Sequence, residues 1–374
     1  MNSPAEIANW RLIVLAAALA LPLFVVLNGA SVTLPDSYFK VSGIPVHASA
    51  LMFLLLPKRF ILRPSELIIL LIYLIYCVFA FLDSEARLQL TVQLGYFIYG
   101  YKILRGLSSQ TIRTLDLYIA VIGSAFIFIH ILSFGQAMIN GDVLASGGKI
   151  FKFVIYQSHI TYPIVLILIL VSVNRSLGHW PILKFIILVL AMLIEIALMR
   201  RAGIGILLIF LLLFERRFLI FALLAIVVSS IFSGGFSEIV MEFFSFAERL
   251  TQLRVGDNGN FTRFRTWENS LELLNDASNV MIGNGKHNHS HNFVLHTITT
   301  HGLLISMVFF FTITYYVFLM TKKISIFNRY SILTFAIIAV DWSVNVNLYQ
   351  PYYAAMFAFF LVSGTVLTRE KHGK

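Results

Sequence analysis

The chain has 374 residues, of which 59% are hydrophobic and only 12% are charged. Soluble domains carry roughly 25% charged residues, so this composition excludes an ordinary soluble globular fold. The net charge of +10 would suggest nucleic acid as a partner of a soluble protein. In so apolar a chain, the position of the basic residues relative to membrane spans is the more useful test. Cys77, which lies in an apolar run, is the single cysteine of the chain. One cysteine excludes an internal disulfide and a cysteine-based zinc site.

Apolar segments recur along the whole chain and are separated by short polar breaks. A helix of about twenty apolar residues crosses the hydrocarbon core of a bilayer, whereas the strands of a membrane β-barrel alternate polar and apolar residues. The sequence therefore predicts an all-α, polytopic integral membrane protein with a single membrane domain over 1–374. The twelve expected spans are 10–31, 43–57, 65–82, 88–104, 114–135, 151–173, 180–199, 202–214, 217–233, 302–320, 329–347 and 351–367. The first run lacks a basic n-region, so a cleavable signal peptide is not expected.

The basic residues indicate the orientation of these spans. If the N-terminus is cytoplasmic, the cytoplasmic breaks hold fifteen of the 28 basic residues on very short segments, as the positive-inside bias requires. These residues are Lys58, Arg59, Arg63, Lys102, Arg105, Arg113, Arg175, Arg216, Arg217, Lys322, Lys323, Arg329, Arg369, Lys371 and Lys374. Both termini are therefore expected in the cytoplasm.

One long polar segment, 234–301, lies between spans nine and ten and is expected outside. It begins with an amphipathic run from Phe236 to Leu253, continues through a polar loop at 256–260 and predicts a helix from Thr262 to Leu274. A stretch rich in glycine and histidine follows at 283–292. Acidic residues slightly outnumber basic ones in this segment, so it is not expected to bind nucleic acid.

Arg200 and Arg201 stand in a very short external break, directly before the apolar run 202–214. Two cations at this position work against insertion and normally serve a function or pair with an anion. A guanidinium group matches a pair of phosphate oxygens better than a lysine does, so a lipid pyrophosphate is a natural ligand. The alternative is that both side chains simply snorkel from a helix end.

The predicted helix from Thr262 brings together an arginine and a tryptophan. Thr262 is expected to cap this helix, and Arg263 and Trp267 lie four residues apart on one face. Arg265 lies on the same helix and is a supporting candidate. The alternative is an ordinary solvated amphipathic helix.

Alternating histidines follow, at His287, His289 and His291, with His296 and His301 further on. A neutral imidazole near pH 7 can take a proton from a sugar hydroxyl. Two alternatives stay open, a zinc or copper site and a polar loop with incidental histidines.

In this order the elements resemble the O-antigen polymerase and O-antigen ligase superfamily. The resemblance is carried by Arg201-Ala-Gly-Ile-Gly at a span start, Arg263-Phe-x-x-Trp267 in the long loop, Gly283-x-Gly285, and His291-Asn292 with nine residues to Gly302. Its motifs cover about 195–310, and the first six spans agree in character only.

The resemblance implies a glycosyltransferase in the bacterial inner membrane whose donor is a glycan on undecaprenyl pyrophosphate, with 234–301 as a periplasmic loop that carries part of the active site. It implies neither a metal nor another cofactor. Arg201 and Arg263 would bind the pyrophosphate, with Arg200 as a further candidate, and His291 would act at the acceptor hydroxyl. Supporting positions would be Trp267, Arg265, His289 and Asn292. Membrane lipids and a chain-length regulator protein are the expected partners.

Three functions remain open at this stage. A polymerase would transfer the growing glycan to a lipid-linked repeat unit, whereas a ligase would use the same donor and a lipid A core acceptor. Twelve spans with both termini inside are also the layout of many transporters and flippases. The chain shows no matching Gly- or Pro-interrupted segments in its two halves and no core-oligosaccharide site, so the sequence favours the polymerase.

Overall fold

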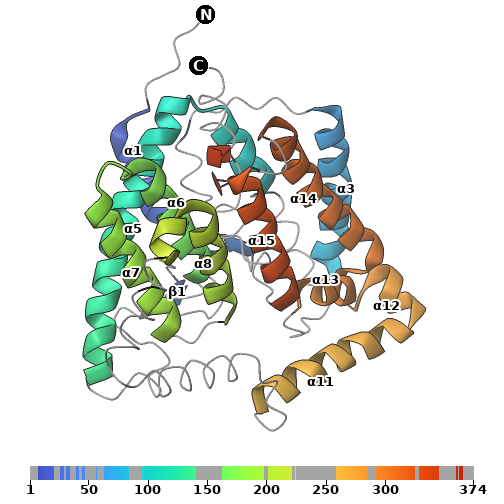
Figure 1. The fold of residues 1–374 in the computed structure, drawn as a ribbon. Helices are drawn as coiled ribbons and strands as arrows, with labels where there is room; N and C mark the ends of the chain where they lie inside the picture. The colour runs from blue at the N-terminus through green and yellow to red at the C-terminus, as the bar shows by residue number, and fades with distance from the viewer. Residues whose placement is uncertain are drawn as a thin grey trace, which may run out of the picture.

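The computed structural model describes residues 7–20, 26–28, 31–33, 39–41, 44–46, 56, 63–83, 95, 97–139, 162–197, 201–220, 224, 258–284, 292–324, 328–344, 359–360 and 362–364. This part of the chain is predominantly helical, in agreement with the predicted helical fold class (Figure 1). The side chains of Arg201 and Arg263 lie outside the description, although their backbones are part of helices.

The N-terminal region differs from the prediction. Helix α1 (Asn9–Ala20) is followed by two antiparallel hairpins, β1 (Val26–Asn28) with β2 (Ser31–Thr33), and β3 (Phe39–Val41) with β4 (Ile44–Val46). The expected spans 10–31 and 43–57 are therefore not continuous helices. Pro22 stands two residues after α1, where proline stops a helix. Each hairpin has a two-residue connection that contains glycine, which tight β-turns prefer.

Helices occupy the described parts of most of the other expected spans. They are α3 (Pro64–Asp83), α5 (Ser109–Ile139), α6 (Tyr162–Ser176), α7 (Pro181–Ala197), α8 (Arg201–Phe214), α14 (Leu303–Ile324) and α15 (Arg329–Val344), with helical stretches at 97–105 and 216–220.

The number of twelve membrane spans is not confirmed. Among the described residues, one stretch, Ser109–Ile129, is long and apolar enough to cross a membrane by length and composition, and the other apolar stretches found are shorter. Part of the difference between twelve expected spans and one arises because some of the helices are too short to cross the hydrocarbon core. The 14 residues of α8 rise about 21 Å at 1.5 Å per residue, which is less than a hydrocarbon core of about 30 Å.

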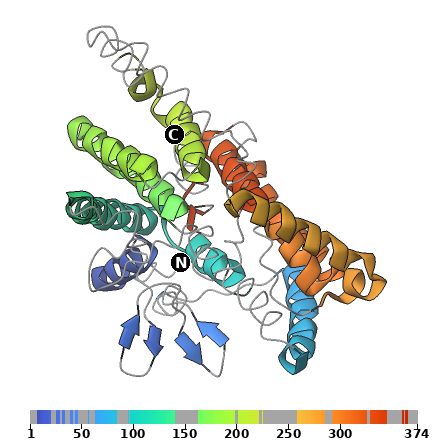
Figure 2. The ribbon, with the colours of Figure 1, turned by 90° about the horizontal axis from the view of Figure 1, so that it is seen from below.

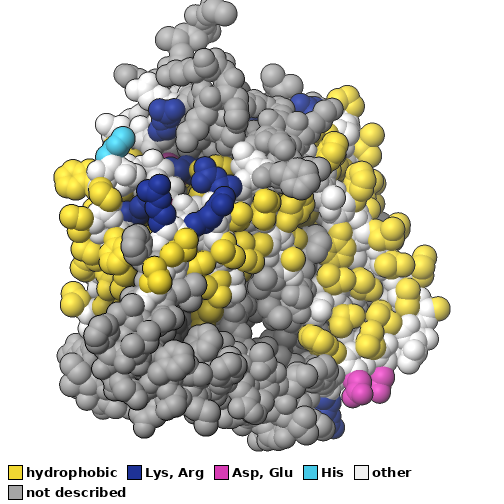
Figure 3. All heavy atoms as spheres, in the orientation of Figure 1, with side chains coloured by type: hydrophobic (Ala, Val, Ile, Leu, Met, Phe, Trp, Pro, Cys, Tyr) yellow, Lys and Arg dark blue, Asp and Glu magenta, His cyan; other side chains and the backbone are white. Residues whose placement is uncertain are grey.

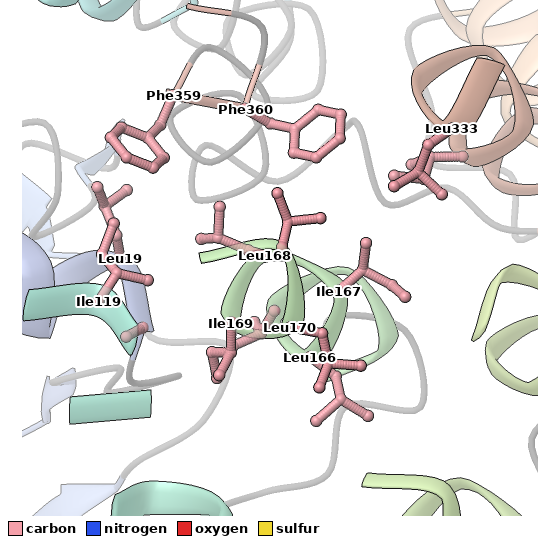
Figure 4. Close-up of a cluster of buried hydrophobic side chains, with 14 of the residues drawn as sticks. Leu19, Ile119, Leu166, Ile167, Leu168, Ile169, Leu170, Leu333, Phe359 and Phe360 are labelled. Atoms are coloured by element: carbon pink, nitrogen blue, oxygen red, sulfur yellow. The ribbon is translucent and has the colours of Figure 1, made fainter. Parts of the chain in front are cut away.

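Helix α6 forms the centre of the packed helices. Every residue from Val165 to Val173 is buried, so this stretch is enclosed on all sides rather than on one face. Figure 4 shows its leucines and isoleucines facing Leu19 of α1 and Ile119 of α5 on one side, Phe359 and Phe360 above, and Leu333 of α15 on the other side. Close packing here depends on Gly123, because a Cβ at this position would lie 2.8 Å from Cδ1 of Ile169.

The helices form a series of neighbours through this core. Helix α1 packs on α5, α5 on α6 and α7, α6 on α8, and α8 on α15. Helices α3 and α14 lie on the side of the molecule away from α1 and α5, and both hairpins lie next to α1 (Figure 2).

The described part of the long polar segment consists of short helices. They are α11 (Asn258–Glu272), a 3-10 turn (Leu273–Asn275), α12 (Ala277–Ile282) and α13 (Phe293–His301), which leads into α14. Helix α11 begins four residues before Thr262, so the prediction that Thr262 caps it is wrong. Residues 258–260, expected in a loop, form its first turn, where backbone N–H groups have no partner within the helix and polar residues are well tolerated.

Candidate functional site

Helix α11 carries three of the sequence-predicted site residues. Arg263 and Trp267 are four residues apart within it, as predicted, and therefore lie on the same face. The Trp267 side chain is half-buried, whereas Arg265 is exposed. Helix α11 packs against α13, so its arginines belong to the same local unit as Asn292, the residue that precedes α13.

The nine-residue interval between Asn292 and Gly302 is the length of helix α13. Asn292 is the N-cap, and its side-chain oxygen accepts a hydrogen bond of 3.0 Å from the backbone N–H of Leu295. Gly302 ends the helix with φ 81° and ψ 163°, a conformation almost restricted to glycine. The spacing that carries the family resemblance therefore describes one short helix with a defined beginning and end. His291 immediately precedes its N-cap, in the stretch 285–291 that lies outside the described residues.

Gly283 and Gly302 join the end of α12 to the end of α13. Gly283 also has a positive φ, 76°, and a Cβ on it would lie 2.5 Å from the backbone nitrogen of Gly302. A Cβ on Gly302 would lie 2.6 Å from the carbonyl carbon of Met281. The backbone N–H of Asn284 donates a 2.8 Å hydrogen bond to the carbonyl oxygen of Thr299. Two motif elements that are 19 positions apart thus form one backbone junction.

Helix α13 buries more polar groups than the apolar composition of the chain would suggest. His296 is 4% exposed, and Thr297, Thr299, Thr300 and His301 are fully buried. The Thr299 hydroxyl donates to the carbonyl oxygen of Leu295, at 2.8 Å. Sequence reasoning noted His296 and His301 but gave them no place in the site. The available signal was five polar residues within nine positions of a largely apolar chain.

Helix α8, which begins at Arg201, is aligned by its contacts with α15. At its far end, Nη1 of Arg329 donates to the carbonyl oxygen of Leu213 at 3.4 Å, and the ring of Phe214 lies 5.1 Å from that of Tyr330. The last turn of α8 therefore lies beside the first turn of α15. Arg201 then lies toward the other end of α15.

Helix α14 places α13 at that same end. It runs for 22 residues, about 33 Å, from the glycine junction to Ile324, close to the start of α15 (Figure 1). The junction is therefore remote from Arg329, and α15 also packs against α13. The backbone of Arg201 and the α11–α13 unit lie at one end of the helices. Arg200, His287, His289 and His291 lie outside the described residues.

The opposite end of the helices, around the last turns of α6 and α8, carries mostly basic side chains. Lys184 pairs with Glu215 at 2.7 Å, and Asn174 also donates to Glu215. Figure 3 shows Lys and Arg side chains gathered over the upper ends of α6 and α8, with hydrophobic side chains covering the surface below them.

Two buried ionic contacts connect helices within this half. Asp116 on α5 accepts a 2.7 Å hydrogen bond from the Ser172 hydroxyl and lies 3.6 Å from the Arg175 guanidinium group on α6. Glu66 on α3 pairs with Lys102, and the Tyr316 hydroxyl of α14 donates to Glu66 at 3.3 Å. These contacts bring together residues far apart in sequence and were not predicted.

Within the part of the chain that the structure describes, no three His, Cys, Asp or Glu side chains are grouped closely enough to hold a metal ion. The alternating histidines at 287, 289 and 291 are not covered by this statement.

No family model, no curated protein and no solved structure matches this chain.

Proposed function

We propose that this protein is a membrane-embedded O-antigen polymerase. It transfers the growing glycan from undecaprenyl pyrophosphate to a lipid-linked repeat unit at the periplasmic face of the bacterial inner membrane. The observation that carries the proposal is the helix between Asn292 and Gly302, closed against Gly283. This helix supports the view that the nine-residue motif spacing corresponds to a defined structural unit and is not a chance match.

The exposed apolar surface supports a membrane location. Large hydrophobic side chains are more than half exposed along α3, α7 and α14, including Leu67, Ile182, Leu304 and Phe311. Monomeric soluble proteins rarely expose contiguous apolar patches larger than a few hundred Å². Lipid is the environment in which such helix faces are stable.

The polarity of the two ends supports the proposed orientation. The Lys- and Arg-rich ends of α6, α8 and α15 fit the cytoplasmic surface under the positive-inside bias. The α11–α13 unit and the start of α8 are at the other end, where a glycan carried on a flipped lipid is presented.

The proposed chemistry is a direct displacement. The acceptor hydroxyl attacks the anomeric carbon of the donor, the bond from that carbon to the pyrophosphate oxygen breaks, and His291 takes the hydroxyl proton. Arg201 and Arg263 bind the departing pyrophosphate and stabilise its charge. Attack from the face opposite the leaving group inverts the anomeric configuration.

Purified protein tests this proposal and its rivals in one assay. The chain is incubated in detergent with undecaprenyl-pyrophosphate-linked repeat units, without any membrane gradient. A polymerase produces a ladder of lengthened lipid-linked glycans. A product that forms only when lipid A core is added identifies a ligase. Intact substrate under both conditions, together with gradient-driven movement of the lipid in vesicles, identifies a transporter or flippase and overturns the proposal.

A further inference from the structure

Two short helices of the long polar segment differ in the surface they present. Helix α11 exposes Arg265, Glu268 and Glu272, at spacings of three and four residues that place them on one face. Helix α12 exposes polar residues only at its beginning, at Asp276 and Ser278, and ends in two adjacent exposed apolar residues, Met281 at 60% and Ile282 at 61%. The charged face of α11 is therefore suited to contact with water, whereas the apolar end of α12 is not.

The apolar end of α12 lies beside the start of an apolar stripe on α14. The backbone of Met281 and Ile282 lies against Gly302, since a Cβ there would be 2.6 and 2.7 Å from their carbonyl carbons. Directly after Gly302, Leu304, Met307 and Phe311 are 63%, 61% and 67% exposed. Their spacing of three and four residues puts them on one face of α14. Hydrophobic side chains cover this side of the molecule in Figure 3.

We propose that Met281 and Ile282 are a membrane anchor of the periplasmic segment, inserted at the boundary between headgroups and acyl chains of the outer leaflet. The occupant of this surface is lipid, because Met281 and Ile282 adjoin the start of the α14 stripe and neither they nor the stripe residues Leu304, Met307 and Phe311 are charged. The described charges of this segment lie on α11 and at Asp276, the N-cap at the opposite end of α12. This inference rests on the membrane placement in the proposed function and does not depend on the reaction.

The anchor would set the height of the candidate site. Gly283 and Gly302 fix α12 to the N-terminal end of α14, and α12 and α11 both pack on α13. Insertion of α12 therefore holds α11 and the start of α13 at headgroup level, which is where the pyrophosphate of a lipid-linked glycan lies.

Depth-dependent fluorescence quenching in the full-length chain tests the anchor. In a Cys77→Ser background, three single-cysteine variants are labelled with bimane and placed in phosphatidylcholine nanodiscs: Ile282→Cys, Phe311→Cys and Leu271→Cys. Leu271 is the matched control, because it is a 52% exposed leucine on the charged helix α11. Phe311 is the reference for lipid contact, about 12 Å further along α14 than Leu303. The quenchers are doxyl lipids labelled near the headgroup or near the chain end, and aqueous iodide.

We expect the probe at 282 to be quenched several-fold more strongly by the shallow doxyl lipid than by iodide, and the probe at 271 to show the reverse. Quenching by iodide at both 282 and 271, with lipid quenching at 311, would overturn the anchor and leave the membrane placement intact. Shielding of 282 from both quenchers, together with disulfide-linked dimers when the unlabelled Ile282→Cys variant is oxidised, would show that a second copy covers the surface and would also overturn the anchor. Absence of lipid quenching at 311 would overturn the anchor together with the membrane placement.

Discussion

Gly283 and Gly302 lie against each other with positive φ angles of 76° and 81°, and each fills a space in which a Cβ would meet the backbone of the other's segment. This contact connects the end of α12 to the point where α13 passes into α14. The position of α13 relative to α14 therefore depends on the absence of two side chains.

Alanine at either glycine should destabilise the protein. The backbone conformation costs about 1–3 kcal/mol for a residue with a side chain, and the clash with the facing backbone adds about 1–3 kcal/mol. We expect Gly283→Ala and Gly302→Ala each to lower the midpoint of thermal unfolding of the purified protein. The matched control is Gly205→Ala, since a Cβ at this helical position meets nothing within 4 Å. Equal midpoints for all three variants and the wild type would refute the backbone junction.

The buried pair of Glu66 and Lys102 predicts a second effect on stability. Lys102→Met leaves the Glu66 carboxylate buried without its cation, which typically costs about 3–5 kcal/mol. The double variant Glu66→Gln/Lys102→Met removes both charges and keeps an oxygen that can accept from Tyr316. We expect thermal unfolding to show a large loss for the single variant and recovery of most of it in the double variant. A double variant no more stable than the single one would argue against an ion pair.

The sequence predicts helices more reliably than the contacts between them. Helices α7, α8, α14 and α15 begin within a few residues of the expected spans, because a continuous apolar run has one favourable structure where few polar groups interrupt it. The same reasoning is wrong at 26–33. Each strand there is only three residues long and contains one β-branched valine, and so short a segment suits a strand as well as a helix.

In the candidate site too, the sequence predicts the local helix but not the contacts between distant residues. The interval from Asn292 to Gly302 is visible in the sequence, and its capped ends follow from residue preferences of helix termini. The contact of Gly302 with Gly283 and the pairing of Glu66 with Lys102 are tertiary relationships between distant positions. Nothing in a single sequence fixes which distant backbones or charges meet.

The proposed membrane orientation predicts the signals of two reporter fusions. A reporter fused after Asn258, at the start of α11, should report a periplasmic location. A reporter fused after Lys323, at the end of α14, should report a cytoplasmic location. The reason is that basic residues at the ends of α6 and α8 favour the cytoplasm. Paired alkaline phosphatase and green fluorescent protein fusions read both sides. Reversed signals would place Arg201 and Arg263 on the wrong side for a flipped lipid-linked glycan.

Replacement of His291 distinguishes proton transfer from metal binding. If His291 is the general base, His291→Ala should lower the elongation rate by roughly 10²–10⁴-fold, with smaller effects for His287→Ala and His289→Ala and none from chelators. His291 differs from these neighbours because it directly precedes the N-cap of α13, where a helix can hold the imidazole in place. Chelator-sensitive elongation that zinc restores, with equal losses for all three variants, would replace the general base with a metal site.

The most direct test of the central claim is the elongation rate of purified Arg201→Lys and Arg263→Lys variants on lipid-pyrophosphate-linked repeat units. Lysine keeps the charge but loses the paired donors that match a pyrophosphate. The exposed Arg265→Lys variant, on the same helix as Arg263, serves as a comparison for a supporting position. We expect elongation to fall by at least an order of magnitude in the first two variants at unchanged protein yield and thermal midpoint, and less in the third. Full-length glycan from both Arg201→Lys and Arg263→Lys at the wild-type rate would contradict pyrophosphate binding by this pair.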